Sequence, residues 1–131
     1  MTLIRRTILP ILLAAAWITV SEFLRNTFLL HDYWMAHYRE LGLNFPESTL
    51  NGVVWGGWSL CFAIVIYFVS GKFSLLHTTL LSWFAGFVLM WVVTGNLGVL
   101  PFGILPVAIP LSLLEAFVAS VIIKKSSGPA K

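Results

Sequence analysis

Residues 7–30 read TILPILLAAAWITVSEFLRNTFLL, an apolar run that contains only two charged side chains, Glu22 and Arg25. A helix needs about 20 apolar residues to cross the hydrocarbon core of a bilayer. The run is therefore long enough to be a membrane-spanning helix. Ionisable residues inside such helices are costly, and they often mark a functional site. The segment predicts both a fold class and a candidate site.

Three further apolar runs follow at residues 50–70, 73–94 and 102–123. Turn-forming residues separate them: Pro46, Gly71, the GNLG sequence at residues 95–98, and Pro101. The whole chain is 59% hydrophobic and 10% charged, with a mean hydropathy of +0.93. Soluble domains carry about 25% charged residues, so the composition excludes an ordinary soluble enzyme. We expect an all-α integral membrane protein, a four-transmembrane-helix bundle forming one domain over residues 1–131.

The charged residues outside the four spans indicate an orientation. The basic residues before the first span, between the second and third, and after the fourth share one side, and they are Arg5, Arg6, Lys72, Lys124, Lys125 and Lys131. An excess of lysine and arginine marks the cytoplasmic side of a membrane protein. We therefore expect both termini to be cytoplasmic and the location to be a bacterial inner membrane. The lipid bilayer is the expected partner, and no basic patch follows a phosphate backbone as nucleic-acid binding would require.

The outer loop, residues 31–48, combines aromatic and charged residues, which suits a short amphipathic helix lying at the membrane interface. Residues 124–131 form a polar tail. The start of the fourth span leaves two alternatives open. Either Pro106 lies in the first helical turn, or the helix starts near Phe102 and is kinked at Pro110.

The strongest site candidates are the acids of the first and fourth spans. Glu22 lies nine residues before His31, and Glu115 lies nine residues before Lys124. At about 1.5 Å per residue, each acid is about 14 Å from its boundary, near the middle of the bilayer. The two acids could therefore meet in the bundle. They predict either a proton- or cation-binding site or a hydrogen-bonded clamp between helices.

Two polar neighbours extend this candidate site. Arg25 and Asn26 lie one helical turn after Glu22, close enough to bond to it. An alternative for Arg25 is to extend towards the outer membrane interface.

Small and aromatic residues form the remaining patterns. Small residues recur at helical spacing, which favours close helix packing, at Gly52, Gly56, Ser59 and Ala63 of the second span and at Ser112 and Ala119 of the fourth. Three tryptophans could line a pocket for a cation or a flat ligand, or simply pack in the bundle: Trp55, Trp58 and Trp91.

His31, Asp32 and His37 are the residues with metal-ligating chemistry. Their spacing does not match the i, i+4 pair of a helical zinc site, so no metal and no cofactor are expected.

The architecture resembles that of the small multidrug exporters. The features shared are four short spans, a glutamate within the first span at Glu22, and aromatic residues near it. The resemblance implies a small transporter built from a four-helix bundle.

Three functional classes follow from these patterns. The first is a structural or accessory protein, either a homo-oligomer or a small subunit of a larger membrane complex. The second is a small proton- or cation-coupled transporter or channel that uses Glu22 and Glu115. The third is a membrane enzyme or a cofactor- or lipid-binding protein, and enzymatic activity is the least expected of the three.

Overall fold

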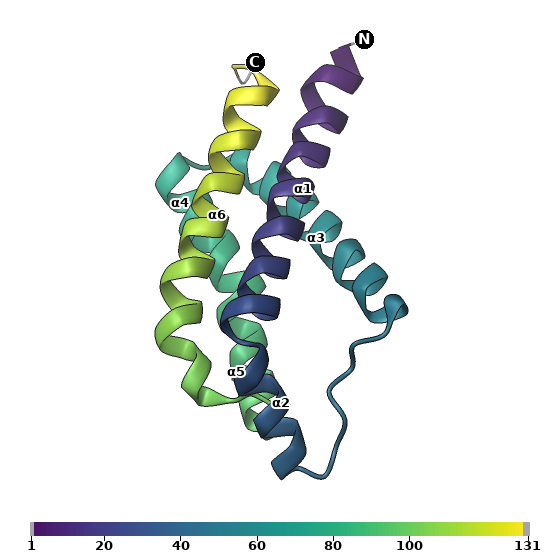
Figure 1. Ribbon diagram of the computed structural model, residues 1–131. Helices are drawn as coiled ribbons and strands as arrows, with labels where there is room; N and C mark the ends of the chain where they lie inside the picture. The colour runs from purple at the N-terminus through teal and green to yellow at the C-terminus, as the bar shows by residue number, and fades with distance from the viewer. Residues whose placement is uncertain (1, 130–131) are drawn as a thin grey trace.

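The computed structural model describes residues 2–129, and every regular element within this range is helical. Four of its helical segments are long and apolar enough to cross a membrane: Ile4–Leu29, Thr49–Ser70, Leu75–Asn96 and Phe102–Ser127. They pack as a bundle with both ends of the chain at the same end of the molecule (Figure 1). The predicted all-helical fold with four long apolar helices is confirmed.

The helical segments are composed of shorter elements. The first is α1 (Leu9–Leu24), with π-helical turns at Ile4–Ile8 and Arg25–Leu29. The short helix α2 (His31–Glu40) precedes α3 (Thr49–Ser70). The third segment joins α4 (Leu75–Trp83) through a π-helical turn, Phe84–Val88, to α5 (Leu89–Asn96). A 3-10 turn at Phe102–Ile104 leads into α6 (Leu105–Ser127).

The start of α6 combines the two predicted alternatives. The helical segment begins at Phe102 with the 3-10 turn, and Pro106 lies in the first turn of α6. Pro110 lies inside the helix, where its missing N–H leaves the carbonyl of Pro106 without its usual helical partner.

The end of α6 lies beyond the end predicted at residue 123. The helix continues to Ser127, whose hydroxyl donates to the carbonyl of Ile123 over 2.6 Å. Lys124 Nζ donates to the carbonyls of Ser70, at 2.9 Å, and Phe73, at 2.8 Å, and so ties α6 to the end of α3. These bonds extend the helix into the predicted tail, of which residues 130 and 131 lie outside the described range.

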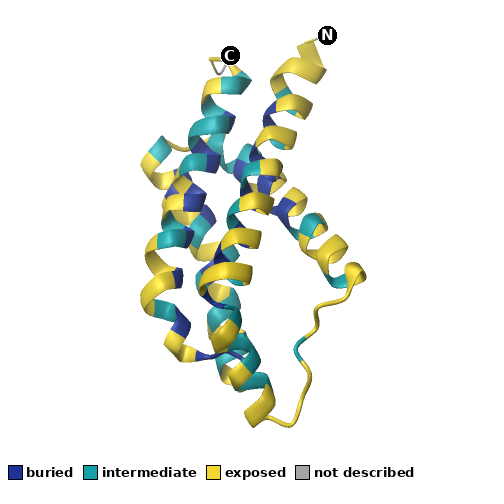
Figure 2. Cartoon of the chain, viewed as in Figure 1, coloured by how far each residue is buried: buried dark blue, intermediate teal, exposed yellow. Residues whose placement is uncertain are grey.

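The larger packed core lies in the half of the bundle nearer the chain ends, and a smaller buried cluster beside the cavity comprises Leu30, Leu100, Ile104 and Ala108. The buried residues of the larger core come from four helical segments (Figure 2), and they include Ala14, Ile18, Phe62, Ala63, Ile66, Phe87, Ala119 and Ile123. Helix α3 contributes to the larger core from Trp58 onwards, whereas its first residues are largely exposed. In Figure 1 the start of α3 diverges from α1, and the α2–α3 connection runs at the edge of the molecule from the end of α2 to the start of α3.

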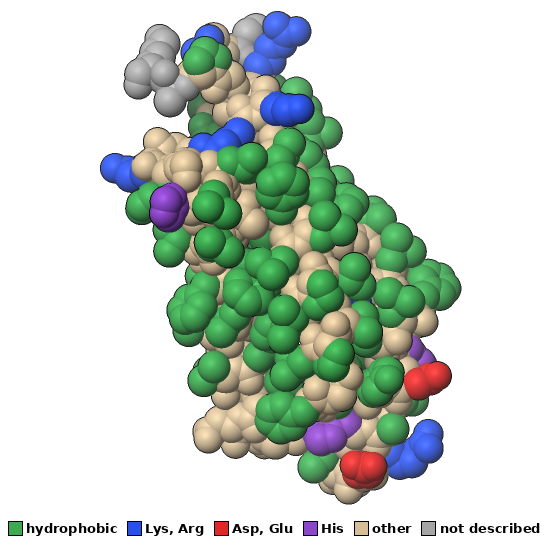
Figure 3. Space-filling view, turned by 90° about the vertical axis from the view of Figure 1, so that its left-hand side faces the viewer, with side chains coloured by type: hydrophobic (Ala, Val, Ile, Leu, Met, Phe, Trp, Pro, Cys, Tyr) green, Lys and Arg blue, Asp and Glu red, His purple; other side chains and the backbone are tan. Residues whose placement is uncertain are grey.

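The surface divides into a broad apolar middle and two polar ends. Large hydrophobic side chains are exposed along the middle of the helices, among them Val20, Leu60 and Phe84. In Figure 3, most of the lysine and arginine atoms gather at the end near the N-terminal residues, while the acids in view lie at the opposite end beside a smaller basic patch. This distribution is the one expected for helices that face hydrocarbon along their middle.

Candidate functional site

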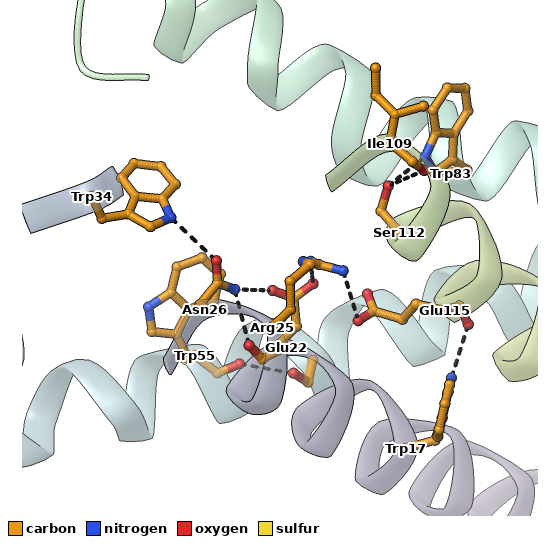
Figure 4. A network of polar contacts seen from close by, with 11 residues as sticks. Trp17, Glu22, Arg25, Asn26, Trp34, Trp55, Trp83, Ile109, Ser112 and Glu115 are labelled. Carbon is orange, nitrogen blue, oxygen red and sulfur yellow. Dashed lines mark hydrogen bonds and ion pairs between the residues drawn. The ribbon is translucent and has the colours of Figure 1, made fainter. Parts of the chain in front are cut away.

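Arg25 lies between the two predicted acids and brings them together (Figure 4). Its Nη2 is 2.6 Å from Glu22 Oε1, and its Nη1 is 3.6 Å from Glu115 Oε1. All three residues are buried, with exposed fractions of 7% for Glu22, 5% for Arg25 and 0% for Glu115. Arg25 therefore does not extend to the molecular surface, which was the alternative open to it in the sequence.

Two antiparallel helices, α1 and α6, position this charged cluster. Glu22 is in the last turn of α1, and Arg25, three residues later, opens the π-helical turn that follows. Glu115 lies near the middle of α6, facing α1. Trp17 Nε1 donates to the backbone carbonyl of Glu115 over 3.0 Å, which fixes the register of the two helices. The buried Ala119, one turn further along α6, lets the helices approach closely.

The hydrogen bonds of the cluster are unevenly distributed. Glu22 accepts from Arg25 at one oxygen and from Asn26 Nδ2, at 2.9 Å, at the other. Within residues 2–129, neither carboxylate oxygen of Glu115 has a hydrogen-bond partner, and neither does Arg25 Nη1. The guanidinium also lies over the ring of Phe87, 5.4 Å from its centroid. Two carboxylates thus surround one guanidinium, and the more deeply buried one, Glu115, is incompletely hydrogen-bonded.

A cavity of about 740 Å³ reaches Glu22, Arg25 and Asn26 from the open side of the bundle. Its walls come from the end of α1, from α2, from the α2–α3 connection, and from the starts of α3 and α6 together with α5. Most of the wall is aromatic or aliphatic, and its aromatic side chains are Trp34, Tyr38, Phe45, Trp55, Phe87 and Trp91. Cavities of this volume and chemistry hold ligands of the size of common drugs.

The three predicted tryptophans separate into two roles. Trp55 and Trp91 line the cavity. Trp58 instead packs in the core, stacked on Phe62 at 5.1 Å between ring centroids and edge-on to Phe87 at 5.7 Å.

The sequence reasoning missed the aromatic side chains of residues 31–48 as cavity residues. Trp34 Nε1 donates to Asn26 Oδ1 over 3.3 Å, which links α2 to the charged cluster, and Phe45 stacks on Trp34. The density of aromatic residues in this loop is a signal for a cavity wall as well as for a membrane interface.

The predicted packing residues also differ in their surroundings. Four of them are buried between helices: Ser59, Ala63, Ser112 and Ala119. Gly52 and Gly56 line the cavity, and a Cβ added at either position would meet no atom within 4 Å. Within the described residues, the packing role predicted for these two glycines has no partner helix.

The metal candidates do not come together. His31 Nε2 contacts Glu47, and its Nδ1 is 3.7 Å from Asp32 Oδ1, whereas His37 Nε2 donates to the carbonyl of Gly98 over 2.8 Å. Among residues 2–129, no three histidine, cysteine, aspartate or glutamate side chains gather as a metal site. The hydrogen bond to Glu47 raises the pKa of His31 above its usual value of 6.5.

The protein is thus an all-helical bundle of four long apolar helices, with a buried cluster of two acids and one arginine beside a cavity. A scan against protein-family models and searches of curated proteins and of solved structures found no match for the chain.

Proposed function

We propose that this chain is an integral membrane protein of a bacterial inner membrane, with both termini in the cytoplasm. The support is the apolar middle of its four long helices and the basic residues near the chain ends. The opposite side carries three acids, Asp32, Glu40 and Glu47, and one basic residue, Arg39. Such a bias sets the orientation of membrane proteins. In this placement α2 lies at the outer interface, and the cavity lies in the outer half of the bilayer.

Within that membrane, we propose that the protein is a small transporter for amphiphilic organic cations, coupled to protonation at Glu22 and Glu115. The observation that carries the proposal is the pair of buried carboxylates around the single guanidinium of Arg25, at one side of a large aromatic cavity. When both acids are ionised, the cluster has one uncompensated negative charge. In a low-dielectric interior such a charge is costly, so a proton or a cation must balance it.

The lining of the cavity supports an organic cation as the ligand. Trp55 and Trp91 offer aromatic faces, and such faces attract cations within about 6 Å of the ring. The positive charge of Arg25 repels a small inorganic cation placed beside it. The two acids already outnumber this charge, so an anionic ligand would add further uncompensated negative charge. Phe23 and Val54, both exposed at the rim, leave the cavity accessible from between α1 and α3. An amphiphile dissolved in the outer leaflet can reach the cavity by this route.

The test is uptake of radiolabelled hexyltrimethylammonium by liposomes that contain the purified protein, driven by an imposed pH gradient. We expect Glu115→Gln and Glu22→Gln to abolish uptake, while Glu40→Gln, the same change at an exposed acid, leaves it unchanged. Hexyl sulfate, with the opposite charge on the same chain, should not compete. The proposal would be refuted if the Glu22→Gln and Glu115→Gln variants keep the near-ultraviolet circular dichroism of the wild type and also transport normally.

A structural or accessory role is the second candidate, and one observation favours it. The first turns of α3 carry the exposed Gly52 and Gly57 and the half-buried Gly56, and a Cβ at any of the three would meet nothing within 4 Å. A second copy or another membrane subunit could pack against such a small-residue face. Native mass spectrometry of the protein extracted in mild detergent distinguishes the two functions. Co-extracted foreign subunits support the accessory role, whereas a retained small organic mass supports the transporter.

A further inference from the structure

One wall of the cavity is an irregular segment rather than a helix. Residues 43–48, here called the strap, connect the end of α2 to the start of α3. In Figure 1 this connection runs alone across the space between the two helices. Four consecutive strap residues line the cavity: Phe45, Pro46, Glu47 and Ser48. The strap therefore separates the cavity from the surroundings on that side.

The strap is held in place mainly by two side chains. No backbone–backbone hydrogen bond involves residues 44–47 within the described chain. The ring of Phe45 stacks on Trp34, 5.7 Å between centroids, and lies edge-on to Tyr38 at 5.2 Å and to His31 at 6.5 Å. The second attachment is the contact of Glu47 with His31 Nε2. Few and local attachments are typical of segments that open without unfolding the rest of a protein.

The helix that receives these side chains is fixed to the bundle. His37 Nε2 donates to the carbonyl of Gly98, between α5 and α6, and Trp34 Nε1 donates to Asn26 beside the charged cluster. Gly42, with φ of +72°, provides the left-handed turn that ends α2 just before the strap. At the other end, Ser48 forms a capping box with Asn51 that begins α3. The strap is thus a short link between two fixed points.

We propose that the strap is a gate between the cavity and the outer aqueous phase, closed by Phe45 among the aromatic side chains of α2 and by the contact of Glu47 with His31. Release of these two side chains opens the cavity towards water without moving α2 or α3. The proposal rests on the proposed membrane placement for the identity of the outer phase. It does not depend on transport of any particular ligand.

The charges at the gate make its closure dependent on pH. His31 faces two acids, Glu47 from the strap and Asp32 from its own helix, and Asp32 is fully exposed. The bond to Glu47 raises the pKa of His31. The ion pair is therefore complete where Glu47 is ionised and His31 protonated, and it is lost as pH rises through the raised pKa of His31. Glu22 and Arg25 lie deeper along the same cavity and pair with each other.

The experiment measures how fast a water-soluble thiol reagent reaches the cavity. Cys61, the only cysteine, is first replaced by serine, and Ser59→Cys then places a thiol of similar size on the buried cavity wall. The probe is the membrane-impermeant trimethylammonium-ethyl methanethiosulfonate, added to proteoliposomes. A cysteine at exposed Glu40 in a separate variant corrects for the pH dependence of the reagent itself.

We expect Phe45→Ala to speed modification of the Ser59→Cys thiol by about tenfold, a change typical of losing well-packed aromatic contacts. Glu47→Gln should speed it severalfold at pH 6 to 7 and remove most of its acceleration at alkaline pH. Phe68→Ala and Glu40→Gln make the same changes at exposed positions outside the strap and should have no effect.

Equal rates in the wild-type and altered straps would overturn the gate, as would equal acceleration by Phe68→Ala. A thiol that reacts in no folded variant, although it reacts in denatured protein, would overturn it as well. Unchanged near-ultraviolet circular dichroism is required of each variant compared. If reagent access changes as expected while no cation is transported, the gate stands and the proposed transport function fails.

Discussion

The two halves of α3 resemble each other in composition but differ in their surroundings. From Ser59 to Ile66 the helix is buried at every turn against the core, whereas from Thr49 to Gly57 it is mostly exposed and borders the cavity. Both halves combine small and apolar residues. Small residues therefore stabilise this bundle only where a neighbouring helix fills the space beside them. Where α3 diverges from α1, the same residue types leave room for a ligand.

The charged cluster lies at the boundary between the packed and open halves. Glu115 belongs to the packed side, fully buried behind Arg25, while Glu22 and Arg25 border the cavity. A change of charge at the cavity can therefore reach the packed helices through Arg25.

Arg25→Met should be the most damaging change. It leaves Glu22 and Glu115 without their shared cation, and removing one partner of a buried ion pair costs about 3–5 kcal/mol. The free energy of unfolding, measured by denaturant titration in detergent micelles, should fall by that amount. Arg39→Met, the same change at an exposed position of α2, is the control and should cost little. Equal losses in both variants would contradict a central role for the cluster.

Trp58 and Trp55, one turn apart on α3, should separate stability from binding. Trp58→Ala opens a hole beside Phe62 and Phe87, and we expect a loss of about 3 kcal/mol in the free energy of unfolding. Trp55→Ala should cost much less stability, because Trp55 is 47% exposed. It should instead weaken binding of hexyltrimethylammonium by about tenfold, the loss of one cation–π contact. Denaturant titration measures the stability of each variant, and calorimetric titration measures its affinity for hexyltrimethylammonium. A larger loss of stability in Trp55→Ala, or a larger loss of affinity in Trp58→Ala, would contradict this division.

Replacing a glycine by alanine in each half of the bundle tests how closely that half is packed. A Cβ at Gly86 would lie 2.6 Å from Phe62 Cε2, and Phe62 is held between Trp58 and Phe87. Gly86→Ala should therefore destabilise the bundle by about 1–3 kcal/mol through overpacking. A Cβ at Gly57 meets nothing within 4 Å, so Gly57→Ala should stabilise α3 by about 0.5–1 kcal/mol. Thermal unfolding of the two variants in micelles gives both signs in one assay.

Much of the fold was predictable from the sequence because it depends on segment length. Runs of apolar residues and the turn formers between them gave four long helices. Counting residues from the ends also placed Glu22 and Glu115 at similar depth, where the structure brings both to Arg25. These inferences require only the rise of a helix and the positions of charges.

The cavity and the roles around it were not predictable in the same way, because they depend on the angle between helices. Trp55 and Trp58 are three residues apart on one face of α3, and only the divergence of the helix separates a cavity wall from a core residue. Arg25 could equally have extended to the surface, since sequence spacing alone does not give the position of Glu115. Residues 31–48 looked like an interface helix, and nothing in their pattern revealed that Phe45 folds back on Trp34.

The smallest effect that we expect is on the pKa of His31, whose contact with Glu47 holds the strap over the cavity. His31 is held by Glu47 and, less directly, by Asp32, so its pKa is raised mainly by the bond to Glu47. Glu47→Gln should therefore lower the pKa of His31 towards 6.5, and Asp32→Asn should lower it less, because Asp32 is 3.7 Å away and fully exposed. NMR titration of the imidazole protons measures both shifts, with His37 and His77 as internal references.

The raised pKa of His31 makes the attachment of the strap depend on pH. A raised pKa means that the charged contact holds the strap at pH values below 6.5 and weakens as pH rises through the raised value. Amide hydrogen exchange at residues 44 and 45, corrected for its intrinsic rate, should accelerate over the pH range in which His31 loses its proton. In Glu47→Gln the exchange should be fast throughout this range. If exchange stays slow and does not change as His31 loses its proton, then Phe45 alone closes the cavity.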